Sequence, residues 1–242
     1  RQGIRITATV VVSAAAVASF LLPESLPREK RKPFTWSVGC GKSIKMLHML
    51  FLRRGSVLWD LAVIHFTKGM ISGVPTFLAF RGILNMTDKD FAILMTINGI
   101  GGVIVQSLVL KIMVQCSLSH LTIIGFGIIV EMAAYLGYSS LKVFPAKLLL
   151  FSLRGLQTLS RVYGHAFDAL ATQGANDDKG FVLGAFAAVD TLTSVFAPLL
   201  MAGIYQISRI APFIVVVSLD CICLVLVGML RRRLRHAAFL AT

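Results

Sequence analysis

Charged residues are scarce in this chain of 242 residues. They make up 14% of it, whereas a soluble domain typically contains about 25%, and hydrophobic residues make up 56%. This composition excludes a soluble globular domain. Acidic residues are the scarcest, with 11 against 24 lysines and arginines, which gives a net charge of +13. The basic residues lie between apolar segments and not on one continuous face, so we expect no nucleic-acid partner.

Cysteine is also rare, and its four residues form no disulfide framework. Cys221 and Cys223 are two positions apart, so they point to different faces of a predicted helix, and no histidine lies near them to complete a metal site. Paired carboxylates at a useful spacing, metal-ligand clusters and nucleophile motifs are missing as well. We therefore predict neither an enzyme nor a bound metal or cofactor.

The chain contains seven long apolar runs. They cover residues 6–22, 56–80, 91–114, 120–138, 144–168, 180–205 and 210–230, and they predict an all-α multi-pass membrane protein in contact with the lipid bilayer. The first run is interpreted as a truncated helix. The six helices that follow would by themselves expose a polar seam to lipid, so we expect the chain to be a fragment. Its expected parts are a last helix of a preceding half (1–22), a basic cytoplasmic connection (23–55), a six-helix transmembrane bundle (56–230) and a basic cytoplasmic tail (231–242).

The distribution of lysine and arginine predicts the orientation of this bundle. About fourteen of these residues lie in the 23–55 connection, the 111–119 and 169–179 links and the tail, whereas about four lie in the opposite links. Because positive residues collect on the cytoplasmic side, we expect a cytoplasmic C-terminus, in a plasma membrane or an endomembrane. Asn85 opens an Asn-Met-Thr sequon in an opposite link and is a candidate glycosylation site.

The run 144–168 carries two arginines in its middle. On one continuous helix, a single face about 80° wide would collect Arg154, Gln157, Arg161, His165 and Asp168. A guanidinium that faces lipid at the bilayer centre costs at least about 3 kcal/mol, so this face has to meet water, a counter-charge or a solute. Two interpretations stay open: a structural ion pair inside the bundle, and a solute pathway.

A second polar face lies in the run 56–80, where His65, Lys68, Ser72 and Thr76 recur at helical spacing.

Small residues predict where helices approach closely. Asn98, Gly102 and Gln106 line one edge of the run 91–114, and Gly180, Gly184 and Ala188 line one edge of the run 180–205.

Three segments resemble the C-terminal half of a major facilitator superfamily transporter. They are LLPESLPREKRKPF (21–34), NGIGGVIVQ (98–106) and, for tetracycline-efflux-like and hippocampus-abundant-transcript-like members, the pattern of Gly180 and Gly184 followed by Ala197-Pro198 and Gly203-Ile-Tyr205. The resemblance implies a six-helix half whose partner, the N-terminal half, is missing here, and it adds Pro198 and Gly203 to the helix-packing residues. It also implies that the runs 56–80 and 144–168 are the two helices that line the solute cavity.

The resemblance implies secondary active transport of a small solute by alternating access, and together with the polar faces it leads us to expect proton-coupled antiport of the efflux type. The expected cavity wall consists of Lys68, Ser72, Arg154, Gln157 and Arg161, and its arginines suit an anionic carboxylate or phosphate. The groups expected to exchange protons are Asp60, His65, His165 and Asp190. Gate or structural ion pairs are expected at Glu131, Asp168 and Asp220.

Two alternatives to antiport stay open. One is a carrier of organic anions that their own gradient drives, which the cationic wall favours. The other is a non-transporting receptor or scaffold on the same fold. For Asp190 an ion pair with an arginine of the run 144–168 is the alternative to proton exchange.

Overall fold

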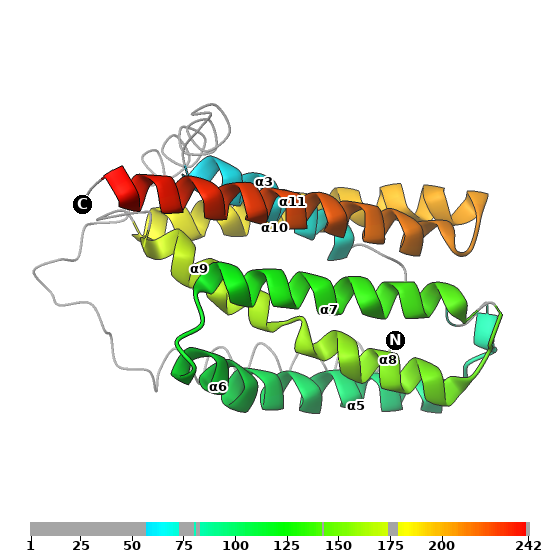
Figure 1. Ribbon diagram of the computed structural model, residues 1–242. Coiled ribbons are helices and arrows are strands. Elements are labelled where there is room, and N and C mark those ends of the chain that lie inside the picture. Colours follow the sequence, from blue (N-terminus) through cyan, green and yellow to red (C-terminus); the bar gives the residue numbers. More distant parts are fainter. Residues whose placement is uncertain (1–56, 73–79, 81–82, 142, 174–178, 241–242) are drawn as a thin grey trace, which may run out of the picture. The chain divides into compact units, whose positions relative to one another are not determined.

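The computed structural model describes residues 57–72, 80, 83–141, 143–173 and 179–240. These residues form helices joined by short connections, with no strand among them. In chain order the elements are α3 (Val57–Ser72), α5 (Asp88–Ile104), η2 (Val105–Val109), α6 (Leu110–Gln115), α7 (His120–Ser140), α8 (Lys147–Leu159), α9 (Val162–Gln173), α10 (Lys179–Ile207) and α11 (Ala211–Leu240) (Figure 1). The predicted parts 1–22 and 23–55 lie outside the described residues.

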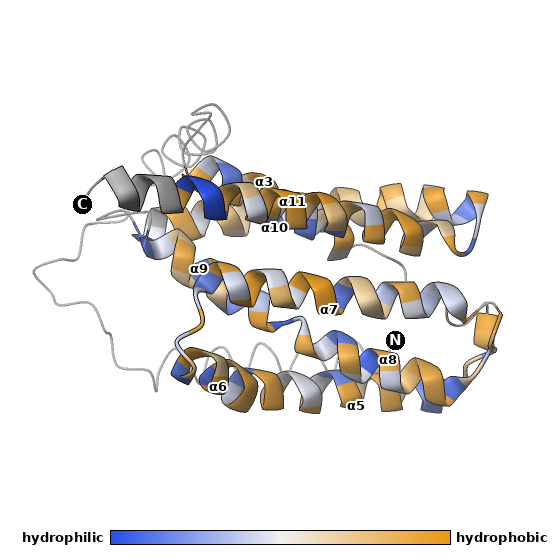
Figure 2. Cartoon of the chain, viewed as in Figure 1, coloured by the Kyte–Doolittle hydropathy of each residue, from blue (hydrophilic) through white to orange (hydrophobic). Residues whose placement is uncertain are grey.

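Four helical segments are long and apolar enough to cross a membrane, and they fit an integral membrane protein. Figure 2 shows hydrophobic residues along most of their length. The segments are Asp88–Gln115, His120–Ser140, Val182–Ile207 and Ala211–Leu234. They correspond to the predicted runs 91–114, 120–138, 180–205 and 210–230. The predicted tail differs, because α11 continues as a helix through the arginines to Leu240.

Short polar residues set where two of these helices begin. The Thr87 side chain accepts a hydrogen bond from the backbone N–H of Asp90, whose carboxylate accepts one from the Thr87 N–H, so the pair caps α5 reciprocally. Ser119 caps α7 by accepting from the N–H of Thr122. Asn85, the candidate glycosylation site, is exposed in the connection before α5.

The run 144–168 is not the continuous helix that the sequence predicts. It forms α8 and α9, which are separated by a turn at Ser160 and Arg161. Hydroxyl groups promote this break, because Thr158 donates to the carbonyl of Gly155 at 2.7 Å and Ser160 to that of Gln157 at 2.8 Å. The backbone N–H groups of Ser160 and Arg161 bond three residues back and not four, which tightens the chain at this point.

The predicted run 56–80 is described as a helix only over α3, and residues 73–79 lie outside the described part of the chain. α3 packs against α10 and α11. α7 packs against α8, α9 and α11, and α5 packs against α8. The run 91–114 contains a second irregularity, the π-helical turn η2, which divides α5 from α6.

Close helix packing uses glycines other than those predicted in α10. A Cβ atom on Gly127 of α7 would lie 2.8 Å from the carbonyl oxygen of Ser160, at the break between α8 and α9. Similar close contacts surround Gly69, Gly101, Gly102 and Gly137. By contrast, no described atom lies within 4 Å of a Cβ built on Gly180, Gly184 or Gly203, and Pro198 is exposed. The packing role predicted for these four α10 residues is therefore not found among the described helices.

Replacing Gly127 with alanine should destabilise the bundle by about 1–3 kcal/mol, because the added methyl group meets a backbone carbonyl that cannot rotate away. Gly125→Ala, two residues earlier on α7, is the matched control, since no atom lies within 4 Å of its Cβ position. The measurement is the thermal unfolding midpoint of both variants in detergent. Equal midpoints for the two variants would contradict the predicted contact.

Candidate functional site

Three charged side chains meet inside the bundle. The Nζ atom of Lys68 on α3 donates hydrogen bonds to Glu131 Oε2 on α7 and, at 2.8 Å, to Asp220 Oδ1 on α11. The residues are 4%, 8% and 0% exposed, respectively. The Lys68 ammonium also lies 4.9 Å from the centre of the Tyr163 ring, an arrangement that favours a cation. We call these three residues the ion cluster.

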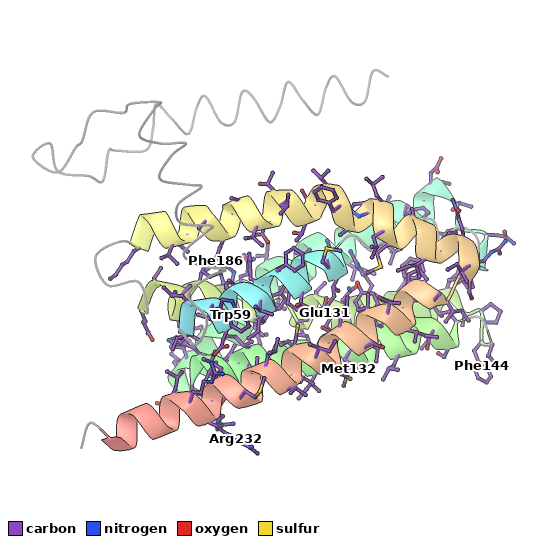
Figure 3. All side chains as sticks on the ribbon, turned by 90° about the horizontal axis from the view of Figure 1, so that it is seen from above. Trp59, Glu131, Met132, Phe144, Phe186 and Arg232 are labelled. Carbon is purple, nitrogen blue, oxygen red and sulfur yellow. The ribbon has the colours of Figure 1, made fainter. Side chains whose placement is uncertain are left out.

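The ion cluster lies between two apolar cores. Glu131 is found among the helices, whereas Phe144 and Arg232 lie at the outside (Figure 3). One core surrounds the first half of α7 and the other surrounds its second half. On each helix the charged residue lies between a residue of one core and a residue of the other, namely Ile64 and Ile71 on α3, Ile128 and Tyr135 on α7, and Val216 and Cys223 on α11.

Because the ion cluster is buried, forming it costs desolvation free energy, and only one alignment of the three helices brings its charges together. Taking each charge out of water costs several kcal/mol, and only partners at the same depth on the neighbouring helices can offset that cost. With all three groups ionised, the cluster carries a net charge of −1. Asp220 Oδ2 is buried and has no hydrogen-bond partner among the described residues. The ion cluster therefore fixes the relative heights of α3, α7 and α11 and keeps one carboxylate oxygen unpaired.

The arginines of the run 144–168 contact different neighbours. Arg154 on α8 donates to Gln157 Oε1 at 2.6 Å, and the Tyr138 hydroxyl of α7 donates to the same oxygen at 2.9 Å. Arg161, in the break, donates to Asn98 Oδ1 of α5 at 2.9 Å and to the Asn98 carbonyl at 3.4 Å. Neither guanidinium contacts a carboxylate among the described residues.

The predicted single polar face is therefore wrong in its geometry. The turn at Ser160 and Arg161 interrupts the helix, so the regular spacing of 100° per residue that defined one face does not hold across it. His165 and Asp168 on α9 are exposed, and no hydrogen bond or ion pair joins them to other described residues. Asn98 and Gly102 meet Arg161, whereas Gln106 on the same predicted edge is exposed.

The four predicted proton-exchanging groups fall at three places, of which the exposed His165 on α9 is one. His65 Nε2 lies 2.8 Å from Asp190 Oδ1 on α10, but the geometry is outside that of a hydrogen bond. Phe167 stacks on the His65 ring with centroids 4.8 Å apart, and the Asp190 side chain is 59% exposed. Asp60 is buried and accepts from Arg233 of α11 at 2.8 Å. Asp190 therefore pairs with a histidine and not with an arginine of the run 144–168, and Asp60 is already engaged.

The predicted cavity wall also includes Ser72. The side chain of Ser72 lies outside the described residues, so its place in a cavity wall stays a prediction. Within the described part of the chain, no group of three or more His, Cys, Asp or Glu residues is arranged to hold a metal ion.

Sequence reasoning missed that Lys68, Glu131 and Asp220 meet. It assigned the lysine to a solute cavity and the two acids to separate gates or ion pairs. The sequence did contain a signal for this cluster. Glu131 and Asp220 each lie near the middle of an apolar span, and a buried carboxylate there needs a cation at the same depth in the membrane. Asn98 was noticed for helix packing only, and the role of Tyr138 beside Gln157 had no sequence signal.

Lys68→Met should destabilise the protein by about 3–5 kcal/mol, because it leaves two buried carboxylates without a cation. The triple variant Lys68→Met, Glu131→Leu, Asp220→Leu should recover most of this loss, since apolar replacement of a whole buried ion cluster is often neutral or stabilising. The measurement is the fraction of monodisperse protein after heating in detergent. A triple variant as unstable as the single one would show that the charges are needed for more than mutual compensation.

The sequence matches no family model and no curated protein. The function of these residues has to be inferred from their chemistry and their positions.

Proposed function

We propose that this bundle is one half of a secondary active transporter of the major facilitator type, which exchanges a small anionic solute for protons. The observation that carries the proposal is the pair of guanidiniums at Arg154 and Arg161, which have no carboxylate partner among the described residues. A permanent positive charge within a membrane bundle is costly without an anion. A solute carboxylate or phosphate that visits the site supplies one.

The break between α8 and α9 favours solute binding at the same place. Discontinuous helices are typical of transporter binding sites, because the ends of half-helices present backbone dipoles to a solute. Arg161 lies in the break itself, and Arg154 lies two turns earlier on α8. The amide of Gln157 accepts from both Arg154 and Tyr138, so it can hold the first guanidinium ready for a fork-like contact.

The pair of His65 and Asp190 favours coupling to protons. Asp190 lies inside an apolar segment, yet more than half of its side chain is exposed. A carboxylate in such a position cannot face lipid without a large cost, so it needs water or a second protein surface. We propose that the second half of the transporter supplies this surface, and that Asp190 and His65 bind and release the proton there.

Two other functions remain as alternatives. A carrier of organic anions without proton coupling would use the same arginines but would not respond to a pH gradient. A non-transporting receptor or scaffold would be folded and yet move no solute. For all three functions we propose a cytoplasmic C-terminus, because most basic residues lie in the connections on the same side of the membrane as the C-terminal tail.

Arg154→Ala should abolish solute uptake while leaving the protein folded, because the side chain contacts neutral groups and not a buried charge. The measurement is uptake of a panel of radiolabelled mono- and dicarboxylates into proteoliposomes that contain the full protein. Arg154→Lys should keep only part of the activity, since lysine lacks the planar fork. Lys111→Ala, an exposed charge on α6, is the control and should transport normally.

Loss of folded Arg154→Ala protein in detergent would support a structural role for the contact of Arg154 with Gln157 and count against the transport proposal. Normal uptake by this variant would remove Arg154 from the solute site. If the wild-type protein is folded but takes up none of the anions, the scaffold alternative is favoured.

Asp190→Asn should abolish the response of uptake to an imposed pH gradient while preserving exchange of labelled for unlabelled solute. The physical reason is that an amide cannot take up the proton whose release drives net movement. Asp88→Asn, in the first turn of α5, is the matched control. If the rate of wild-type uptake does not change with the imposed pH gradient, the anion carrier without proton coupling is favoured.

A further inference from the structure

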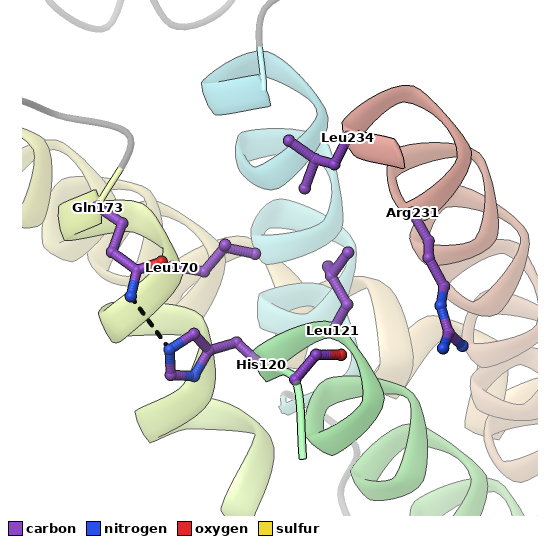
Figure 4. A pocket seen from close by; sticks show the side chains of 7 residues that line it. His120, Leu121, Leu170, Gln173, Arg231 and Leu234 are labelled. Carbon is purple, nitrogen blue, oxygen red and sulfur yellow. Dashed lines mark hydrogen bonds between the residues drawn. The ribbon is translucent and has the colours of Figure 1, made fainter. Parts of the chain in front are cut away.

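A pocket of about 440 Å³ opens where α7 begins, α9 ends and α11 leaves its apolar segment. Figure 4 shows its lining side chains, which come from these three helices and from Ser119, the residue before α7. They are Ser119, His120, Leu121, Leu170, Gln173, Arg231 and Leu234. The volume lies within the range typical of pockets for small molecules, about 300–1,000 Å³. No residue of this pocket belongs to the ion cluster or to the proposed solute site.

The lining divides into an apolar part and a polar part. Leu121, Leu170 and Leu234 each come from a different helix and supply apolar surface. The polar part contains Arg231 and His120, and the His120 ring nitrogen Nε2 lies 3.2 Å from Gln173 Nε2, so the two side chains orient each other (Figure 4). A ligand that fills this pocket therefore has to be amphipathic.

Charge indicates that the polar end of the ligand is an anion. Arg231 has no hydrogen-bond or ion-pair partner among the described residues, and no carboxylate lines the pocket. Arg233, two residues further along α11, differs because it is paired with Asp60. An arginine without a partner suits a phosphate group, which guanidinium binds with two parallel hydrogen bonds.

The position of the pocket indicates where such a ligand comes from. The apolar helix α7 begins at His120, and the apolar part of α11 gives way to three consecutive arginines at Arg231. The pocket therefore lies at the boundary between membrane and water, next to the run Arg231, Arg232 and Arg233. Basic pockets between transmembrane helices at this level are suited to anionic lipid headgroups.

We propose that this pocket binds an anionic phospholipid from the membrane leaflet on the side of the C-terminus. The phosphate contacts Arg231, the first part of an acyl chain lies against the three leucines, and the polar remainder of the headgroup faces the His120–Gln173 pair across the pocket. This site does not depend on the proposed transport function, because it uses none of the same residues.

The test is binding of dioctanoyl phosphatidylglycerol to the full protein in a neutral detergent, measured by native mass spectrometry at low ionic strength. Arg231→Gln should weaken binding by about fivefold, the effect expected for one basic contact with an anionic lipid. Arg232→Gln removes the same charge from the next position but does not line the pocket, so it should leave the affinity unchanged. Leu170→Ser should weaken binding without any change in charge.

Three outcomes would overturn the proposal. Equal losses for Arg231→Gln and Arg232→Gln would mean diffuse attraction to a basic surface and not a defined site. Glycerol 3-phosphate that competes as well as the lipid would identify a site for free phosphate esters, without an acyl chain. Binding that none of the three substitutions changes would mean that the lipid does not enter this pocket.

Discussion

The ion pairs of Lys68 with Glu131 and Asp220 are the interaction on which the arrangement of the described helices depends. Glu131 and Asp220 lie near the middle of apolar helices and Lys68 is buried with them, so no one of these charges can remain alone, because desolvation costs several kcal/mol per ion. Sliding any one of the three helices by a turn, about 5.4 Å, would separate its charge from the others. Hydrophobic side chains on either side can pack in many registers, whereas the ion cluster permits one.

The second group of charges is arranged differently. Arg154 and Arg161 contact neutral oxygens, and the break between α8 and α9 directs them to different neighbours. The bundle therefore contains a set of charges that compensate each other and a set that lacks counter-charges among the described residues. The first set suits a structural role, and the second leaves cationic groups for an anion.

Apolar periodicity and length were enough to predict the helical membrane class and the approximate positions of four spans, because the bilayer requires long, internally hydrogen-bonded apolar segments. The positions of Gly127 and Ser160 illustrate what was not predictable. A glycine is informative only when a neighbouring backbone approaches it, and that neighbour, the break between α8 and α9, is distant in sequence. The glycines of α10 follow a clear pattern, but no described helix packs on them.

The sequence by itself determined that this protein consists of apolar helices and that the charged residues within them need partners. Lys68, Arg154 and Arg161 stood out in the sequence because each is a charged residue within a long apolar run. The free-energy cost of placing such a residue in a bilayer can be recognised without knowing the fold. Which charge meets which was decided by the tertiary structure. Lys68 pairs with acids 63 and 152 positions away, and such pairings arise from the depth and rotation of separate helices. Hydroxyl groups that bond to the preceding turn separated Arg154 from Arg161, although their spacing predicted a common face.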